Sequence, residues 1–148
     1  MVQERVLNEL KNLNIKHLLL QVGDSDLIDF PLNGSILNDV YIEYYKFKDS
    51  LDSDIDKADL IVSHAGAGSI LQCLEAKKRL LVVVNETLMN NHQLEIAEEM
   101  EKQGYLFYCT CSTLQTTLKK FQQHQFRAYE RGNPTLFGRY VNQIMLDN

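Results

Sequence analysis

The stretch Asp59-Leu-Ile-Val-Ser-His-Ala-Gly-Ala-Gly-Ser69 decides the fold. An apolar run from Leu60 to Val62 gives way to small residues, and a helical pattern opens at Ser69. The N–H groups at the start of a helix are unpaired and carry the positive end of the helix dipole. Glycines let an anion come close to the backbone. The stretch therefore predicts a strand, a turn and a helix that form an anion-binding loop, with a phosphorylated ligand as the leading candidate.

On either side of this loop, strand and helix patterns alternate along the chain. Strands are expected over residues 15–22, 40–45, 60–62, 80–84 and 105–110, and helices over 2–13, 51–58, 69–77, 92–103, 114–121 and 133–148. The run Leu80-Leu-Val-Val-Val84 is apolar on both faces, as parallel strands are. The sequence predicts one α/β, Rossmann-like domain over residues 1–148, with a mostly parallel sheet covered by helices on both faces.

Two loops follow adjacent strands of this predicted sheet. Ligands of such sheets bind beyond the carboxyl ends of the strands, so the loops 63–69 and 85–91 are expected to form two walls of one site. Imidazole, hydroxyl and amide groups can bond to phosphate or sugar oxygens. The candidate ligand-binding residues are His64, Gly66, Ala67, Gly68, Ser69 and Gln72 from the first wall, and Asn85, Glu86, Asn90, Asn91, His92 and Gln93 from the second.

Several of these residues also have purely structural interpretations. Ser69-x-x-Gln72 fits a capping box, and Asn90-x-x-Gln93 fits a helix start. His64 could bond a loop carbonyl, and the glycines could serve only to pack the helix on the sheet. Both interpretations remain open at this point.

The glycine loop lacks the third glycine of the fingerprint that binds redox dinucleotides, and this bears on which nucleotide it could hold. Glu86 stands 20 residues after Gly66, which is near the acidic spacing of the redox dinucleotide fingerprint. However, Leu71 occupies the place of the third glycine. The pattern favours a mononucleotide or a nucleotide-sugar over a redox dinucleotide.

Composition excludes several classes of protein. The net charge is −5 and no dense Lys/Arg cluster is present, which argues against a nucleic-acid surface. The cysteines Cys73, Cys109 and Cys111 are odd in number, which favours a reduced compartment over a disulfide framework. Cys109 and Cys111 could ligate a metal, but no Cys/His pair with zinc-like spacing accompanies them, so they are expected as buried or half-buried thiols of a strand. Residues 1–20 do not form a signal peptide, and no apolar run reaches the length of a membrane span. Asp24-Ser25-Asp26 and Asp52-Ser53-Asp54 both match an Asp-x-Asp metal pattern. The second lies in the predicted helix 51–58 and is interpreted as a solvated face with favourable N-terminal charge, and the sequence favours no metal at the first.

Three motifs, in this order, resemble one family. They are the opening stretch, Val84-Asn-Glu-Thr-Leu-Met-Asn-Asn-His-Gln-Leu-Glu95 and Gly104-Tyr-Leu-Phe-Tyr-Cys-Thr-Cys-Ser112. The chain is similar, from about Leu10 to Ser112, to the small catalytic subunit of the eukaryotic UDP-GlcNAc transferase that adds the second GlcNAc to dolichol-linked GlcNAc. More widely, it resembles the C-terminal, donor-binding half of GT-B glycosyltransferases.

The resemblance implies a function. The donor would be UDP-GlcNAc, with its diphosphate on the loop His64–Ser69 and its sugar or nucleotide near Asn85, Glu86 and Asn90–Gln93. Transfer to GlcNAc-diphosphodolichol would invert the anomeric carbon and form a β1→4 link in lipid-linked oligosaccharide assembly for N-glycosylation. No cofactor and no metal would be required.

The same resemblance implies a partner and a location. A membrane-anchored, acceptor-binding subunit would complete the cleft and recruit this cytoplasmic chain to the cytosolic face of the endoplasmic reticulum. The segment 133–148 would be a docking helix or, equally well, part of the core.

Two departures from the family pattern leave an alternative open. The family normally begins with a strand and a Gly-Thr-Thr-rich loop before the helix expected here at 2–13. Related proteins also often carry Glu where this chain has Gln72, a position that contacts the nucleotide ribose in the bacterial relative. No general base is identifiable, although an inverting transfer needs one. The alternative is a truncated, non-catalytic relative that binds the partner or the nucleotide-sugar without turnover.

Overall fold

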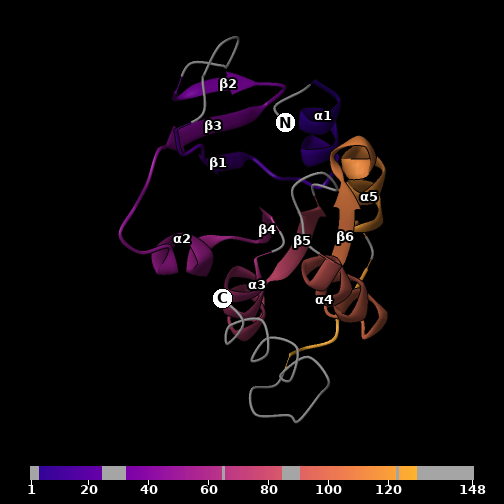
Figure 1. Cartoon of the computed structure of the whole chain (residues 1–148). Coiled ribbons are helices and arrows are strands. Elements are labelled where there is room, and N and C mark those ends of the chain that lie inside the picture. Colours follow the sequence, from indigo (N-terminus) through magenta and orange to yellow (C-terminus); the bar gives the residue numbers. More distant parts are fainter. Residues whose placement is uncertain (1–3, 25–32, 65, 85–90, 123, 130–148) are drawn as a thin grey trace.

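A computed structural model describes residues 4–24, 33–64, 66–84, 91–122 and 124–129 (Figure 1). The described ranges contain six strands and five α-helices, which alternate from the third strand onward, whereas the first three strands follow one another without a helix between them. The strands are β1 (His17–Gln21), β2 (Ser35–Leu37), β3 (Val40–Tyr45), β4 (Leu60–His64), β5 (Arg79–Val84) and β6 (Phe107–Thr110). The helices are α1 (Glu4–Asn12), α2 (Asp52–Lys57), α3 (Ala67–Glu75), α4 (Asn91–Lys102) and α5 (Leu114–Lys120), with a short 3-10 turn, η1 (Cys111–Thr113). The predicted α/β class is confirmed.

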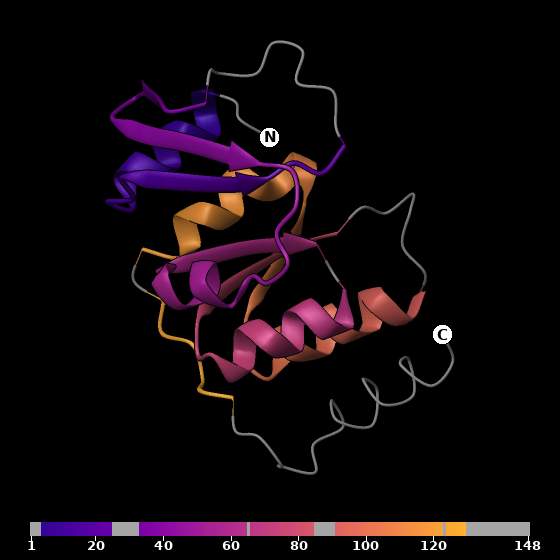
Figure 2. The ribbon, with the colours of Figure 1, turned by 90° about the vertical axis from the view of Figure 1, so that its left-hand side faces the viewer.

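The strands form two three-stranded sheets. The first has the order β1-β3-β2, with β1 parallel and β2 antiparallel to β3. The second, with the order β4-β5-β6, is wholly parallel. The edges of β1 and β4 face each other across the molecule (Figures 1 and 2) and, within the described residues, neither pairs with a strand on that side. The mostly parallel pairing is as predicted, whereas its division between two sheets is not.

Strand β5 explains why the second sheet is covered on both faces. Leu80 and Val82 lie in one buried cluster, beneath α3 and α4, and Leu81 lies in another, with α1 and α5. All three side chains have no exposed surface. Since successive side chains of a strand point to opposite faces, an unbroken apolar run requires apolar neighbours on both. The sequence prediction for this strand is confirmed.

Helix α1 closes the second cluster through an amphipathic stripe. Leu7 and Leu10 are buried on it, and α1 packs beside α5. Glu9 lies on the same face with only 7% of its surface exposed. Its carboxylate lies 3.6 Å from Nζ of Lys119 and accepts a bond from the Gln115 amide at 3.4 Å, so the buried charge is compensated.

The hairpin β2–β3 was not expected, because β2 has only three residues. Its signal is the turn Asn38-Asp39, in which both residues have positive φ, at 50° and 64°. Leu37 pairs directly with Val40, so these two residues are the whole loop. Two successive left-handed residues are typical of the type I′ turn, which matches the twist of paired strands. The predicted helix at 133–148 lies outside the described residues.

The cysteines partly match the prediction. Cys73 and Cys109 are buried, whereas Cys111 is exposed at the start of η1 rather than packed in a strand. Burial raises the pKa of the Cys109 thiol to about 11. All three thiols are free. None of the described helices has the length and apolar content that a membrane span requires.

Candidate functional site

The loop between β4 and α3 is a tight turn built around one carbonyl. Strand β4 ends at His64, and its carbonyl oxygen accepts a bond from the Gly66 N–H at 2.9 Å and another from the Ser63 hydroxyl at 3.0 Å. Gly66 then adopts an extended conformation at the N-cap position of α3, where it has no side chain to bond the free N–H groups, and its carbonyl accepts the Ile70 N–H at 3.0 Å. The chain thus passes from strand to helix in two residues, which places the start of α3 directly over the end of β4.

The helix begins earlier than the sequence suggested, and the capping-box interpretation is wrong. Ser69 is the third residue of α3 rather than its cap, and no side chain caps the helix. The cap position is instead occupied by Gly66, three residues earlier. Glycine is one of the residues favoured at a helix N-cap, although it has no side chain that could bond the free N–H groups. The N–H groups of Ala67, Gly68 and Ser69 therefore have no side-chain cap, and the first turn contains no acidic residue. Such a helix start attracts an anion.

Two polar side chains converge above the cap. A Cβ atom added to Gly66 would stand 3.2 Å from Nε2 of His64 and 3.9 Å from Oγ of Ser69. Gly66 and Ser69 are half-buried, while Gly68 and His64 are exposed. An anion that reaches the free amides would therefore meet an imidazole and a hydroxyl as further donors. We call Gly66, the first turn of α3 and the His64 side chain the anion cradle.

Gln72 follows the cradle by one helical turn and is held by a carboxylate. Its Nε2 atom donates to Oδ1 of Asp52, on α2, at 2.7 Å. Gly68 and Gln72 are four residues apart and so share one face of α3. The structure thus places this predicted site residue beside the cradle and gives it a partner, 20 residues away, that the sequence did not indicate.

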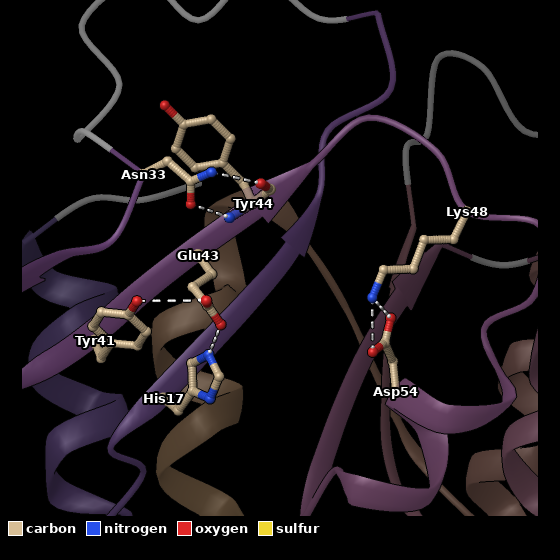
Figure 3. A network of polar contacts seen from close by, with 7 residues as sticks. All are labelled: His17, Asn33, Tyr41, Glu43, Tyr44, Lys48 and Asp54. Carbon is tan, nitrogen blue, oxygen red and sulfur yellow. Dashed lines mark hydrogen bonds and ion pairs between the residues drawn. The ribbon is translucent and has the colours of Figure 1, made fainter.

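Helix α2 is fixed at its first turn by a second acidic side chain. Lys48 donates to both carboxylate oxygens of Asp54, at 2.9 and 3.0 Å, and the Tyr45 hydroxyl donates to the same carboxylate at 3.0 Å. Figure 3 shows the lysine reaching from the loop after β3 to this helix. The bonds from Lys48 are the main reason that the pKa of Asp54 lies below its usual value.

The second wall is described only in part. β4 and β5 run in parallel with His64 opposite Val83, so they end at the same edge. Figure 2 shows α3 and α4 both starting from that edge. The candidates Asn85, Glu86 and Asn90 lie outside the described residues, and for Asn91, His92 and Gln93 the structure describes the helical backbone alone. Asp26, in the metal candidate Asp24-Ser25-Asp26, is also outside the described ranges.

A cavity of about 360 Å³ lies elsewhere, at the opposite end of the second sheet. Arg79, the first residue of β5, contributes to its wall, together with Tyr105 and Tyr129. Because parallel strands end at the other edge, this cavity is separate from the cradle. Within the described part of the chain, no group of three or more His, Cys, Asp or Glu side chains is placed to hold a metal ion.

Comparison with known proteins connects this geometry to a family. The glycosyltransferase family 28 C-terminal domain matches residues 1–139, which is nearly the whole chain. The chain belongs to this family. The strand–cradle–helix unit at 60–75 is thus part of a glycosyltransferase domain, and the Rossmann-like fold expected from the sequence is confirmed.

Individual relatives carry a more specific name. The chain is 48% identical over 108 residues to the human "UDP-N-acetylglucosamine transferase subunit ALG13", and 50% identical over 105 residues to the mouse protein of the same name. These matches cover 73% and 71% of this chain but only 9% of either relative. The solution NMR structure of an ALG13 superimposes with a TM-score of 0.73 at 24% identity, covering 97% of this chain and 87% of that one. That likeness concerns the fold.

Proposed function

We propose that this chain is the donor-binding domain of a UDP-GlcNAc transferase that acts with a membrane-anchored partner. The single observation that carries the proposal is the anion cradle: an uncapped, glycine-lined helix start at the carboxyl edge of a parallel sheet. The names of the 48–50% identical relatives support UDP-N-acetylglucosamine as the donor and a subunit role. The family match supports glycosyl transfer as the reaction class.

The cradle has the chemistry that a nucleotide diphosphate requires. In the proposed complex, the free N–H groups of Ala67, Gly68 and Ser69 donate to the diphosphate, and His64 adds a donor beside them. When the bond between the anomeric carbon and the diphosphate breaks, negative charge grows on the departing UDP. Fixed backbone dipoles aimed at that charge stabilise the transition state more than the ground state. In this proposal, the role of the described residues is to stabilise the departing UDP.

We expect the groups that bind and activate the acceptor to lie outside the described residues. Inverting transfer needs a base that removes the proton from the acceptor hydroxyl as it attacks the anomeric carbon. We assign none of the described side chains to this role. The proposal places the acceptor, GlcNAc-diphosphodolichol, and the surface that binds it on the membrane-anchored partner, at the cytosolic face of the endoplasmic reticulum. The product would be the β1→4-linked disaccharide lipid.

A reconstitution assay tests the proposal. The chain is co-expressed with its membrane-anchored partner, and transfer of GlcNAc from UDP-GlcNAc to GlcNAc-diphospho-lipid is measured. Transfer is expected with the complex and not with the partner alone. A complex that forms and binds UDP-GlcNAc but transfers nothing would favour a non-catalytic, nucleotide-binding subunit. A chain that binds neither UDP nor UDP-GlcNAc would contradict the donor-site assignment.

Removal of divalent metal provides a second test of the same chemistry. Because the cradle supplies backbone dipoles and donors for the leaving group, we expect transfer to continue when EDTA is present. A loss of activity with EDTA that Mg²⁺ or Mn²⁺ restores would mean that a metal ion shares this role.

A further inference from the structure

We propose that Asp52 is a positioning residue, which orients the Gln72 amide so that its oxygen accepts a hydrogen bond from a sugar hydroxyl of the bound nucleotide-sugar. The proposal rests on the donor site described above and names one interaction within it. Its basis is a single contact between α2 and α3, the 2.7 Å bond from Nε2 of Gln72 to Oδ1 of Asp52.

The identity of the partner fixes the direction of the amide. An ionised carboxylate only accepts hydrogen bonds, so the NH₂ group of Gln72 must face Asp52. The carbonyl oxygen Oε1 then points away from Asp52 and, among the described residues, it has no donor. An amide that could otherwise turn either way is converted into a directed acceptor. Hydroxyl groups of ribose or of a hexose are donors that such an acceptor binds.

Asp52 can hold this direction because α2 is itself anchored. The Asp54 carboxylate, two residues further on, is held by Lys48 and Tyr45. Ile55 is buried in the cluster beneath α3 and α4. The Asp52 backbone N–H also donates to the Ser50 hydroxyl at 3.2 Å. The carboxylate that grips Gln72 therefore projects from a segment fixed on several sides.

The position of Gln72 relative to the cradle completes the geometry. Both side chains of the pair are exposed, so a ligand can reach them. Gly68, whose N–H belongs to the cradle, lies one turn before Gln72 on the same face of α3. A ligand whose diphosphate occupies the cradle would carry a sugar ring on either side of it. One of those rings can meet the Gln72 oxygen, and the proposal covers both sources of the hydroxyl.

The main test compares four variants by calorimetry with UDP-GlcNAc: Asp52→Ala, Asp56→Ala, Gln72→Ala and the double variant of Asp52→Ala with Gln72→Ala. Asp52→Ala is expected to weaken binding about threefold to tenfold, the range for one lost hydrogen bond. Asp56→Ala removes another exposed carboxylate of the same helix and is the matched control, with no change expected. Asp52→Ala is expected to add nothing in a Gln72→Ala background, because the acceptor it orients is gone. An equal loss in both backgrounds would overturn the proposal.

An inverted pair separates orientation from simple loss of contact. Gln72→Glu alone places two carboxylates together and is expected to weaken binding. Adding Asp52→Asn supplies an amide donor to the new carboxylate, which leaves its second oxygen as the acceptor. We expect this double variant to bind UDP-GlcNAc within about twofold of the wild type. No rescue would count against the orienting role.

Ligand truncation identifies the hydroxyl. If the Asp52→Ala loss persists with UDP, which lacks the hexose, the donor is on the ribose; if it appears only with UDP-GlcNAc, the donor is on the hexose. Either result supports the proposal. Equal affinities of the wild type and Asp52→Ala for both ligands overturn it while leaving the donor site intact. A wild-type chain that binds neither ligand contradicts the donor site as well as this inference.

Discussion

The substitution Ser69→Asp is expected to change stability and nucleotide binding in opposite directions. Ser69 is the third residue of an uncapped helix whose first turn has no acidic residue. A carboxylate there interacts favourably with the helix dipole, by about 0.3–1 kcal/mol. For a chain of this size, that should raise the midpoint of thermal unfolding by about 1–3 °C. On the basis of helix electrostatics alone, Ser69→Asp should be more stable than the wild type.

The same carboxylate would stand within the anion cradle. Two unit charges about 4 Å apart repel by about 1 kcal/mol in water and about 4 kcal/mol at an effective dielectric constant near 20. Ser69 is half-buried, so the repulsion from a diphosphate lies between these limits. The loss of affinity for UDP-GlcNAc should therefore be at least about fivefold, and it should shrink as salt is added.

Thermal unfolding and calorimetry on the same preparations test this prediction. Ser69→Asn is the matched control, because it has nearly the shape of the aspartate variant without the charge. It is expected to bind UDP-GlcNAc far better than Ser69→Asp. If both variants weaken binding equally, the effect is steric. If Ser69→Asp stabilises the fold and leaves binding unchanged, the diphosphate does not lie on α3.

Three further outcomes follow from the described contacts. Amide hydrogen exchange should be faster in the edge strands β1 and β4 than in the central strands β3 and β5, because half of the backbone groups of an edge strand lack a ladder partner. A maleimide at pH 8 should label the exposed Cys111 first, while Cys109, whose thiol is buried and has a pKa of about 11, should react only on unfolding. Lys48→Met should lower stability slightly, since the ion pair is near the surface. Because the pKa of Asp54 is depressed in the folded state, the difference in stability between the wild type and Lys48→Met should be present above about pH 4. The difference should vanish at lower pH, as acid protonates Asp54.

The sequence predicts those parts of this molecule that depend on local pattern. The apolar run of β5 and the amphipathic stripe of α1 each encode their own burial, so both were predicted at nearly the right residues. Gly104, which ends α4 with a φ of 84°, was predicted for the same reason. The start of α3 was misjudged because Ser69 and Gln72 match a capping pattern by spacing alone. Nothing in that pattern excludes Gly66 as the cap.

The Asp52–Gln72 contact belongs to a different class of feature. It joins residues on two helices, and its existence depends on how β3, α2 and β4 are connected in space. Closeness in sequence does not indicate this contact, because Asp52 lies 20 residues before Gln72. The only available signal was weak: Asp52 begins a short acidic helix just before β4.

The two sheets are coupled by their shared core, and this bears on how the site keeps its shape. Val40 and Ile42 of the first sheet lie in one buried cluster with Leu81 and Cys109 of the second. The cradle rests on β4 and β5, while the Lys48–Asp54 contact ties the loop after β3 to α2. A shift of one sheet against the other would have to open that cluster, at the cost of exposing fully buried side chains such as Ile42 and Leu81. Asp52, which holds Gln72, lies on α2, and α2 is tied to the first sheet by the Lys48–Asp54 contact. The buried cluster that joins the two sheets therefore helps to keep Asp52 in place beside the cradle.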